Sequence, residues 1–376
     1  MERMMDEERS AAIARDFNRE LFCLLGLPAD NLTLDATKAL LRDKTQQQGN
    51  IILSTINVNW VAQSWRDPSF RAAILNSDLV TLDGKPLVWL SRLMGYPMRE
   101  VVAGSTLIDE INHDKTTAEP LTIFFFGGED EAGRRAVERV NANRGGLKAV
   151  GWLNPGFGSV EEMSRPELIA TVNQANPDIL LVALGAKKGT AWIEHNRHRL
   201  QARIISHLGA TVNFLAGTVR RAPQAVRNLG LEWVWRILQE PKLFSRYAAD
   251  GLLLLRMLLL RLPLWLRYRG WQVRHSRQGH PGSGQWREED PAVTLLFDAD
   301  LQAARNPALR DLLRRAALAD RDLVLDFQAT KFMDGAFLGL LLLLQKQQQK
   351  NGRQLALRHT EGRPAQIFHL FGIPAP

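Results

Sequence analysis

The segments NIILSTINVNW (Asn50–Trp60) and SDLVTLDGKPLVWL (Ser77–Leu90) decide the fold of this chain. Each contains a short apolar run, at Ile51–Leu53 and at Asp78–Leu82, that ends in small polar residues. This pattern is typical of a buried parallel strand whose carboxyl end opens into a site. Ligands of open α/β sheets bind outside the carboxyl ends of the strands, so the pattern predicts a crevice at these two ends.

Polar side chains follow both predicted strands. Thr55 and Asn57 follow the first strand, and Asp83 with Gly84 follows the second. A carboxylate on a tight turn beside hydroxyl and amide groups is suited to act as a general base. We therefore predict catalytic roles for Asp83, Thr55 and Asn57. The structural alternative is that Asp83 and Gly84 only form a turn and that Asn57 only caps a helix.

The composition is that of a globular protein with room for two domains. The chain has 376 residues, of which 45% are hydrophobic and 23% are charged. Its single cysteine, Cys23, excludes an internal disulfide framework and fits a reducing cytoplasm. Residues 1–19 are charged and lack the apolar region of a signal peptide, so we expect a short, poorly ordered helical extension there.

Further strand patterns alternate with helical ones. Apolar runs at 121–126, 147–152, 178–185 and 204–208 predict four more strands, separated by helices of about 10 to 15 residues. The alternation predicts an α/β domain with a Rossmann-like, mostly parallel sheet and right-handed crossovers. Leu21–Gly26 is expected to form an additional edge strand.

Glycines end two of these strands. Gly127 and Gly128 precede a helix, and Gly185 precedes Lys187 and Lys188. Exposed backbone N–H groups at a helix start bind phosphate, so these five residues are candidates for substrate binding. Plain turns with solvated lysines are the alternative, since acidic residues directly follow the first glycine pair.

A basic stretch follows the predicted sheet. Between Arg220 and Arg277 the chain carries eleven Arg and one Lys against three acidic residues, more positive charge than the formal +8 of the whole chain. Within it, Leu252–Leu266 is very apolar but too short and too interrupted by Arg and Pro to span a membrane. Leu mixed with regularly placed Arg favours a helix lying in an anionic membrane interface. The alternative is a helix packed on its own domain or on a second protomer.

The remaining chain predicts a linker and a second domain. Residues 274–290 are rich in Gly, Ser, Pro and His and are read as a linker. Residues 291–376 then predict a small α/β domain in which the helix at 337–350 is nearly all apolar at its start and therefore buried.

Residues 20 to about 250 resemble the WecG/TagA/CpsF glycosyltransferases, which form glycosyltransferase family 26. The matching pieces are Asn31–Leu34, Thr55–Asn57, Asp83-Gly84, Phe126–Gly128, Ala183–Gly185, Ala216–Pro223, Leu231–Trp233 and Gln239–Pro241. The resemblance implies a glycosyltransferase domain at 20–219 and a basic helical appendage at 220–273. It also implies transfer of a sugar from a UDP-sugar, often an N-acetylmannosamine derivative, to a polyprenyl-pyrophosphate-linked acceptor, with inversion and without a metal or other cofactor.

The resemblance also implies roles for individual residues. Asp83 corresponds to the family's proposed base, and Thr55 and Asn57 correspond to polar residues at the sugar site. Arg236 and Arg246 correspond to appendage arginines that close over the nucleotide diphosphate. With the residues suggested by local charge and backbone, the expected substrate-binding set is Gly84, Arg99, Gly104, Gly127, Gly128, Gly185, Lys187, Lys188, Arg220, Arg221, Arg236 and Arg246.

Two positions depart from the family pattern. The family usually has an arginine where this chain has Val101, and Arg99 is the nearest candidate to replace it. Where the family usually has Gln-Glu after the strand end at Gly185, this chain has Gly189 and Thr190. The lost pair would ordinarily contact the donor, so a different donor sugar or a weak activity is implied.

Residues 291–376 resemble a STAS domain, the fold of anti-sigma-factor antagonists. Leu323–Phe327, Phe332–Phe337 and the Leu-rich helix carry this resemblance. Regulatory members have a phosphorylatable Ser or Thr after the aspartate, but here Gly335 follows Asp334 and offers no hydroxyl. A docking or scaffolding role is therefore expected of this domain.

These observations favour a peripheral enzyme of the inner face of the plasma membrane that acts in exopolysaccharide or envelope glycan synthesis. Its expected partners are the UDP-sugar, the acceptor lipid, the membrane surface through 220–273, a protein bound by the STAS-like domain, and a second copy of the chain. The rival interpretation is a catalytically degenerate sugar-nucleotide-binding regulator. Nucleic acid is not expected as a partner, because the basic stretch alternates with Leu runs more than with aromatic residues that stack on bases.

Overall fold

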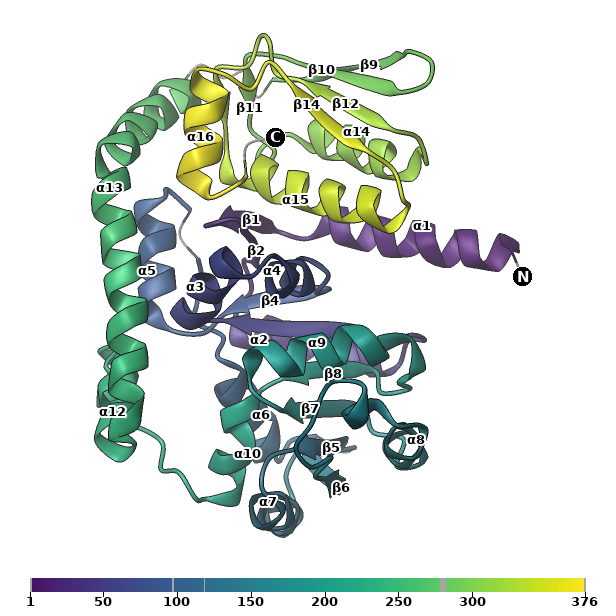
Figure 1. The fold of residues 1–376 in the computed structure, drawn as a ribbon, viewed down its shortest axis with the longest axis vertical. Helices are drawn as coiled ribbons and strands as arrows, with labels where there is room; N and C mark the ends of the chain where they lie inside the picture. The colour runs from purple at the N-terminus through teal and green to yellow at the C-terminus, as the bar shows by residue number, and fades with distance from the viewer. Residues whose placement is uncertain (1, 97, 118, 278–281, 375–376) are drawn as a thin grey trace. The chain divides into compact units, whose positions relative to one another are not determined.

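A computed structural model describes residues 2–96, 98–117, 119–277 and 282–374 (Figure 1). The chain divides into two compact units. One consists of Leu32–Val88 and Arg99–Leu254, and the other of Met1–Asn31, Trp89–Met98 and Leu255–Pro376. We call them the sheet unit and the STAS unit.

The sheet unit is built on a six-stranded, fully parallel sheet in the order β4-β3-β8-β7-β5-β6. Its strands are β3 (Ile51–Ile56), β4 (Leu79–Leu82), β5 (Leu121–Gly127), β6 (Leu147–Leu153), β7 (Ile179–Ala183) and β8 (Ile204–His207). The parallel α/β sheet predicted from the alternating pattern is therefore confirmed.

Two apolar clusters cover the two faces of this sheet, because successive side chains of a strand point to opposite faces. Ile51 and Leu53 of β3 belong to one cluster, and Ile52 belongs to the other. The first face is covered by α2 (Leu34–Thr45), α6 (Gly104–His113), α7 (Asp130–Asn143) and α10 (Gly209–Ala216). The second is covered by α8 (Pro166–Gln174) and α9 (Ala186–Asn196), against which α4 (Pro68–Leu75) and α3 (Val58–Arg66) pack in turn.

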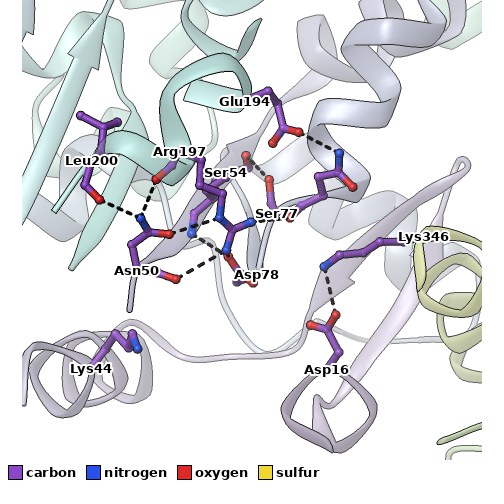
Figure 2. Close-up of polar contacts among 12 residues, drawn as sticks. Asp16, Lys44, Asn50, Ser54, Ser77, Asp78, Glu194, Arg197, Leu200 and Lys346 are labelled. Carbon is purple, nitrogen blue, oxygen red and sulfur yellow. Dashed lines mark hydrogen bonds and ion pairs between the residues drawn. The ribbon is translucent and has the colours of Figure 1, made fainter. Parts of the chain in front are cut away.

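The amino ends of β3 and β4 are closed by a polar network (Figure 2). Arg197, at the start of the 3-10 turn Arg197–Arg199, donates to Asp78 at 2.5 Å. The same carboxylate accepts the backbone N–H of Ile52 at 2.9 Å. Nearby, Ser54 and Ser77 share a hydrogen bond of 2.8 Å. This edge of the sheet is structural, and the opposite edge is left for a site.

The sheet unit ends in short helices that begin the basic stretch. These are α11 (Gln224–Asn228), α12 (Glu232–Gln239) and a 3-10 turn at Pro241–Leu243, and another 3-10 turn lies earlier at Glu162–Ser164. Helix α13 (Phe244–Arg277) follows, with Pro263 inside it. Its start is fastened to α3, because Asn59 donates to the buried Asp250 at 2.7 Å. Across the described residues, no helix is long and apolar enough to cross a membrane.

The STAS unit has a four-stranded sheet in the order β14-β12-β10-β9 and a small parallel pair, β11 with β13. The elements are β9 (Gly284–Glu288), β10 (Val293–Phe297), β11 (Asp300–Leu301), α14 (Pro307–Leu318), β12 (Leu323–Asp326), β13 (Phe332–Met333), α15 (Gly335–Lys350), β14 (Leu355–Arg358) and α16 (Arg363–Phe371). Helix α15 is buried along its first ten residues, as its apolar sequence predicts.

The amino-terminal segment differs from its prediction, because it packs in the STAS unit. Helix α1 (Glu2–Asn18) packs against α14 and α15, and Asp16 pairs with the buried Lys346 at 3.0 Å. Leu21–Leu24 (β1) pairs with Leu27–Asp30 (β2) in an antiparallel hairpin on α15, and neither strand is among the six of the large sheet. A four-residue apolar run does not reveal which of two cores will bury it.

The predicted linker at 274–290 also contains regular structure. Helix α13 continues to Arg277, and His275 pairs with Asp300 at 2.6 Å in a buried contact. Gly284–Glu288 forms β9, which is antiparallel to β10. Residues 278–281 lie outside the described residues. The polar strand β9 was missed because an edge strand exposed on one side need not show apolar periodicity.

Candidate functional site

The carboxyl ends of β3 and β4 bring three predicted residues to one edge of the sheet. Thr55 and Ile56 pair in register with Thr81 and Leu82, so the residues that follow the two strands emerge side by side. The backbone N–H of Asp83 donates to the carbonyl of Ile56 at 2.7 Å. The Asp83 carboxyl group is thus held beside the polar end of β3.

Asn57 and Thr55 have different surroundings. Asn57 caps α3, because its Oδ1 accepts the backbone N–H of Trp60 at 3.2 Å, so the predicted cap geometry is present. Thr55 is buried against the first residue of α6, Gly104. A Cβ at Gly104 would lie 3.1 Å from Thr55 Oγ1 and 2.1 Å from a methyl group of Leu208. Glycine at 104 therefore allows α6 to begin directly on the end of β3.

Asp83 is a partly buried carboxyl group with an unusual pKa. Burial, followed by the charge of Glu232, raises its pKa to about 7, and Arg236 acts in the opposite direction. Glu232 and Arg236 both belong to α12, so the basic stretch reaches this edge of the sheet. A carboxyl group that titrates near neutral pH can accept a proton from a hydroxyl group and is suited to general base catalysis.

Arg236, which acts on Asp83, shares one aromatic ring with Arg221. The guanidinium carbons of Arg221 and Arg236 each lie 5.4 Å from the centroid of Phe214, in α10. Arg221 also donates to Asp109 at 3.0 Å and to the carbonyl of Ser105, both in α6. Cation–π and ion-pair contacts thus hold two positive charges near one another.

The other predicted arginines are placed differently. The exposed Arg220 uses its backbone, which donates to Gln239 at 3.1 Å and accepts from Trp235 at 3.1 Å. Arg246 lies 5.2 Å from the ring of its neighbour Tyr247. Arg99 is exposed. The structure brings Arg221 and Arg236 together on Phe214.

The glycine-rich strand ends lie farther along the same edge of the sheet. Gly127 has a positive φ of 93°, and a Cβ there would meet the carbonyl oxygen of Ala183 at 2.8 Å. Gly185, with a φ of 80°, begins α9 and has open space where a Cβ would point. Gly84 (φ 113°) and Gly128 (φ 81°) also adopt left-handed backbone that favours glycine.

The two predicted lysines are engaged by neighbouring groups. Lys187 pairs with Asp67 at 2.6 Å, and Lys188 donates to the carbonyl of Gly158 at 2.9 Å. The hydroxyl of Thr190 donates within its own helix, to the carbonyl of Ala186 at 2.9 Å. This side of the site therefore offers backbone N–H groups more readily than free cations.

One residue of this edge was missed by sequence reasoning. His207 ends β8, is 8% exposed, and has no described hydrogen-bond partner for Nε2. Its ring lies 5.8 Å from that of Trp60, and a Cβ at Gly189 would lie 2.2 Å from it. Burial lowers the pKa of His207 to about 4, so the imidazole is neutral. Its position at the end of an apolar run was the available signal.

The part of the chain that the structure describes contains no cluster of three or more His, Cys, Asp or Glu side chains able to hold a metal. The two Asp-x-Asp sequences, Asp298-Ala-Asp300 and Asp320-Arg-Asp322, both lie in the STAS unit. There Asp298 accepts the backbone N–H of Ser283 at 3.0 Å, and Asp300 pairs with His275. These carboxylates are used in local structure.

Comparison with known proteins identifies both parts of the chain. Residues 22–267 match the glycosyl transferase WecG/TagA/CpsF family, and this match spans more than half of the sequence. The chain therefore belongs to this family of glycosyltransferases. Residues 285–374 match the Mlab, STAS domain. Both resemblances drawn from the sequence are confirmed, although the STAS match begins six residues before the predicted boundary and includes β9.

Several characterised relatives share one name. The N-acetylglucosaminyldiphosphoundecaprenol N-acetyl-beta-D-mannosaminyltransferase of Bacillus spizizenii is 27% identical over 201 residues, which cover 54% of this chain and 76% of that protein. The enzyme of the same name from Staphylococcus aureus is 23% identical over 251 residues, covering 65% of this chain and 91% of that protein.

Proposed function

We propose that this protein transfers a sugar from a UDP-sugar to a hydroxyl group of a polyprenyl-diphosphate-linked acceptor, with inversion at the anomeric carbon. The observation that carries the proposal is the carboxyl group of Asp83, whose pKa of about 7 suits a base at neutral pH, beside the guanidinium group of Arg236. The names of the relatives supply the acceptor class, since their acceptor is an undecaprenol diphosphate carrying N-acetylglucosamine.

The proposed reaction is a single displacement. Asp83 accepts the proton of the acceptor hydroxyl while its oxygen forms a bond to the anomeric carbon of the donor sugar. The bond between that carbon and the diphosphate oxygen breaks on the opposite face, and UDP leaves with the electron pair. Thr55 and Asn57 flank the base at the end of β3 and are proposed to orient the sugar or the acceptor.

In this proposal Arg221 and Arg236 stabilise the negative charge that develops on the departing diphosphate. Guanidinium groups do so by charge-assisted, bidentate hydrogen bonds, a role that a divalent metal has in other transferases. Both arginines are prearranged on Phe214, so little reorganisation is needed when the donor binds. Gly127, Gly128 and Gly185 are proposed to let phosphate or sugar approach the backbone closely.

A membrane-facing role is proposed for α13. Six of its leucines are more than 40% exposed, namely Leu252, Leu255, Leu259, Leu260, Leu262 and Leu266. The exposed Arg256 lies among them, and the exposed Arg267 and Arg269 follow directly after them. Exposed Leu with Arg suits insertion at the level of anionic headgroups, where a lipid-linked acceptor would be met. We propose that the protein works at the cytoplasmic face of the membrane in this way.

A second function, binding of sugar nucleotides without turnover, is favoured by one observation. On the α9 side of the site, Lys187 is paired with Asp67 and the Thr190 hydroxyl is used inside its helix. Fewer free groups would then hold a donor in a reactive position.

Release of UDP distinguishes the two functions. The protein would be incubated with anionic vesicles, a polyprenyl-diphosphate-linked sugar, and UDP-ManNAc, UDP-ManNAcA, UDP-Glc or UDP-GlcA in turn. Release with one donor that is abolished in Asp83→Asn supports the transferase. Full activity of Asp83→Asn would refute the base assignment, and UDP binding without release from any donor would favour the binding function.

A further inference from the structure

The turn that carries the regulatory position of STAS domains is enclosed in this protein. Asp334 is 4% exposed and caps α15, accepting the backbone N–H of Phe337 at 2.7 Å. Its carboxylate also accepts the backbone N–H groups of Ala303 at 3.3 Å and Ala304 at 3.1 Å. Three backbone donors therefore fix this side chain, but they come from the STAS fold itself.

A fourth donor comes from a distant part of the sequence. The hydroxyl of Tyr96 donates to the Asp334 carboxylate and accepts the backbone N–H of Ala336. The Tyr96 ring stacks on Phe22 of the β1 hairpin, with centroids 5.4 Å apart. Both atoms of the Tyr96 hydroxyl group are thus used at the Asp334–Ala336 turn, and its ring has a partner within the same unit.

Little space is left beside the backbone between these contacts. A Cβ at Gly335 would lie 3.3 Å from ring carbons of Tyr96 and 3.3 Å from Phe371. On the other side of the turn, Tyr268 of α13 is fully buried and donates to the carbonyl of Met333 at 3.2 Å. The chain has three tyrosines, and two of them hydrogen-bond to this one turn.

We propose that Tyr96 of this chain is the permanent partner of the Asp334–Ala336 turn, so that no second protein docks there. Gly335 offers no hydroxyl group at this turn, and the Tyr96 ring fills the space beside it, with two ring carbons 3.3 Å from the position of a Cβ at Gly335.

The chain contains a reporter for this contact. Cys23, its single cysteine, is fully buried in the hairpin next to Phe22, and its Sγ lies 3.6 Å from the carbonyl oxygen of Phe371. Opening of the Tyr96 contact would loosen the hairpin and expose the thiol. The rate at which a thiol reagent such as DTNB labels the native protein therefore measures the contact without any need for enzymatic activity.

Two variants disturb the contact from opposite sides in the full-length protein. Tyr96→Phe removes the hydroxyl group and keeps the ring, and Gly335→Ala adds a methyl group at the 3.3 Å approach. Tyr96→Phe is expected to speed labelling of Cys23 by about tenfold, as expected for loss of one buried hydrogen bond of roughly 1.4 kcal/mol. Gly335→Ala, which crowds the Tyr96 ring, is expected to speed labelling as well, while the unfolding transition of both variants stays cooperative.

Leu313→Ala is the matched control, because Leu313 is fully buried in α14 of the same unit and belongs to none of these contacts. It is expected to lower the stability of the STAS unit while the labelling of Cys23 in the native protein speeds up less than in the two test variants. Unchanged labelling of Cys23 in both test variants, or an equal increase in Leu313→Ala, would overturn the proposal.

Discussion

Burial and, second to it, the charge of Glu232 in the first turn of α12 raise the pKa of Asp83, which follows β4. The two carboxyl groups are 149 residues apart in the sequence, yet each is in the field of the other. Like charges close together favour the protonated form of one of them, which is how neutral-pH bases are often produced in enzymes. This relationship makes the electrostatics of the site testable one charge at a time.

Removing the charge of Glu232 and removing the charge of Arg236 are expected to move the acid limb of the pH–rate profile in opposite directions. Glu232→Gln lowers the pKa of Asp83, so the rate persists to lower pH. Arg236→Gln raises that pKa, so the limb moves to higher pH. Shifts of about 0.5 to 1 pH unit are expected for a neighbouring charge. The measurement is the pH dependence of the transfer rate, and parallel shifts in the same direction would contradict this account.

Asp83→Asn is expected to abolish transfer and to stabilise the protein. Loss of a general base costs about two to four orders of magnitude in rate. The pKa of Asp83 is raised above its ordinary 3.8 to about 7, so the free energy of unfolding falls as the pH rises through this window. Asparagine does not titrate, so the variant does not lose stability in this way. In urea unfolding, its free energy of unfolding is expected to exceed that of the wild-type protein by an amount on the order of 1 to 3 kcal/mol at pH 8, and by little at pH 4.

Asp78→Asn is the matched control at the other end of the same strand. Asp78 pairs with Arg197 at 2.5 Å and has no part in the proposed chemistry (Figure 2). Its substitution is expected to destabilise the sheet unit by about 1 to 3 kcal/mol while the active fraction keeps its transfer rate. A stabilised Asp78→Asn protein would contradict the structural role of the amino edge.

The neutral His207 is expected to make the protein sensitive to acid. Its pKa is lowered from 6.5 to about 4, so the folded state binds fewer protons than the unfolded state between these values. The contribution of neutral His207 to the free energy of unfolding is therefore fully present above pH 6.5 and is lost as the pH falls toward 4. In His207→Phe, which keeps a ring beside Trp60, the midpoint of urea unfolding should change less over this range. Equal pH dependence in both proteins would rule out His207 as the cause.

Substitutions on α13 are expected to weaken binding to membranes. Leu260 and Leu266 are 72% and 66% exposed, so Leu260→Gln with Leu266→Gln should leave folding unchanged. Affinity for anionic vesicles is expected to fall by tenfold or more, because each leucine inserted in the interface contributes about 1.5 kcal/mol or more. Leu318→Gln, on an exposed position of α14, is the control. Unchanged sedimentation with vesicles in the double variant would argue against a membrane role for this face.

The sheet and its polar edge were predictable because each depends on local sequence. Buried parallel strands are continuous apolar runs, and residues such as Thr55, Asn57 and Asp83 follow them directly. Their carboxyl ends share one edge in any parallel sheet, so their proximity follows from the class of fold. The predicted buried start of α15 is present for the same reason.

Features set by distant residues were not predictable. The pKa of Asp83 depends on α12, and the charge of Lys187 is matched by Asp67, 120 residues earlier. Neither pairing leaves a periodic signal. The short strand Leu21–Leu24 was assigned to the wrong core, since an apolar run of four residues fits either sheet. His207 was overlooked because a single histidine at a strand end has the same sequence pattern whether it is buried or solvated.

The placement of the first 31 residues in the STAS unit has a consequence for synthesis of the protein. Asp16 leaves the ribosome 330 residues before Lys346, with which it pairs. At about 5 to 20 residues per second, its partner is translated roughly 20 to 60 s later. The sheet unit can fold during that interval, but Ile13, Phe17 and Leu21, which are buried in the finished protein, must wait with no core to enter. A nascent chain of this kind is expected to need a chaperone near its amino terminus until translation ends.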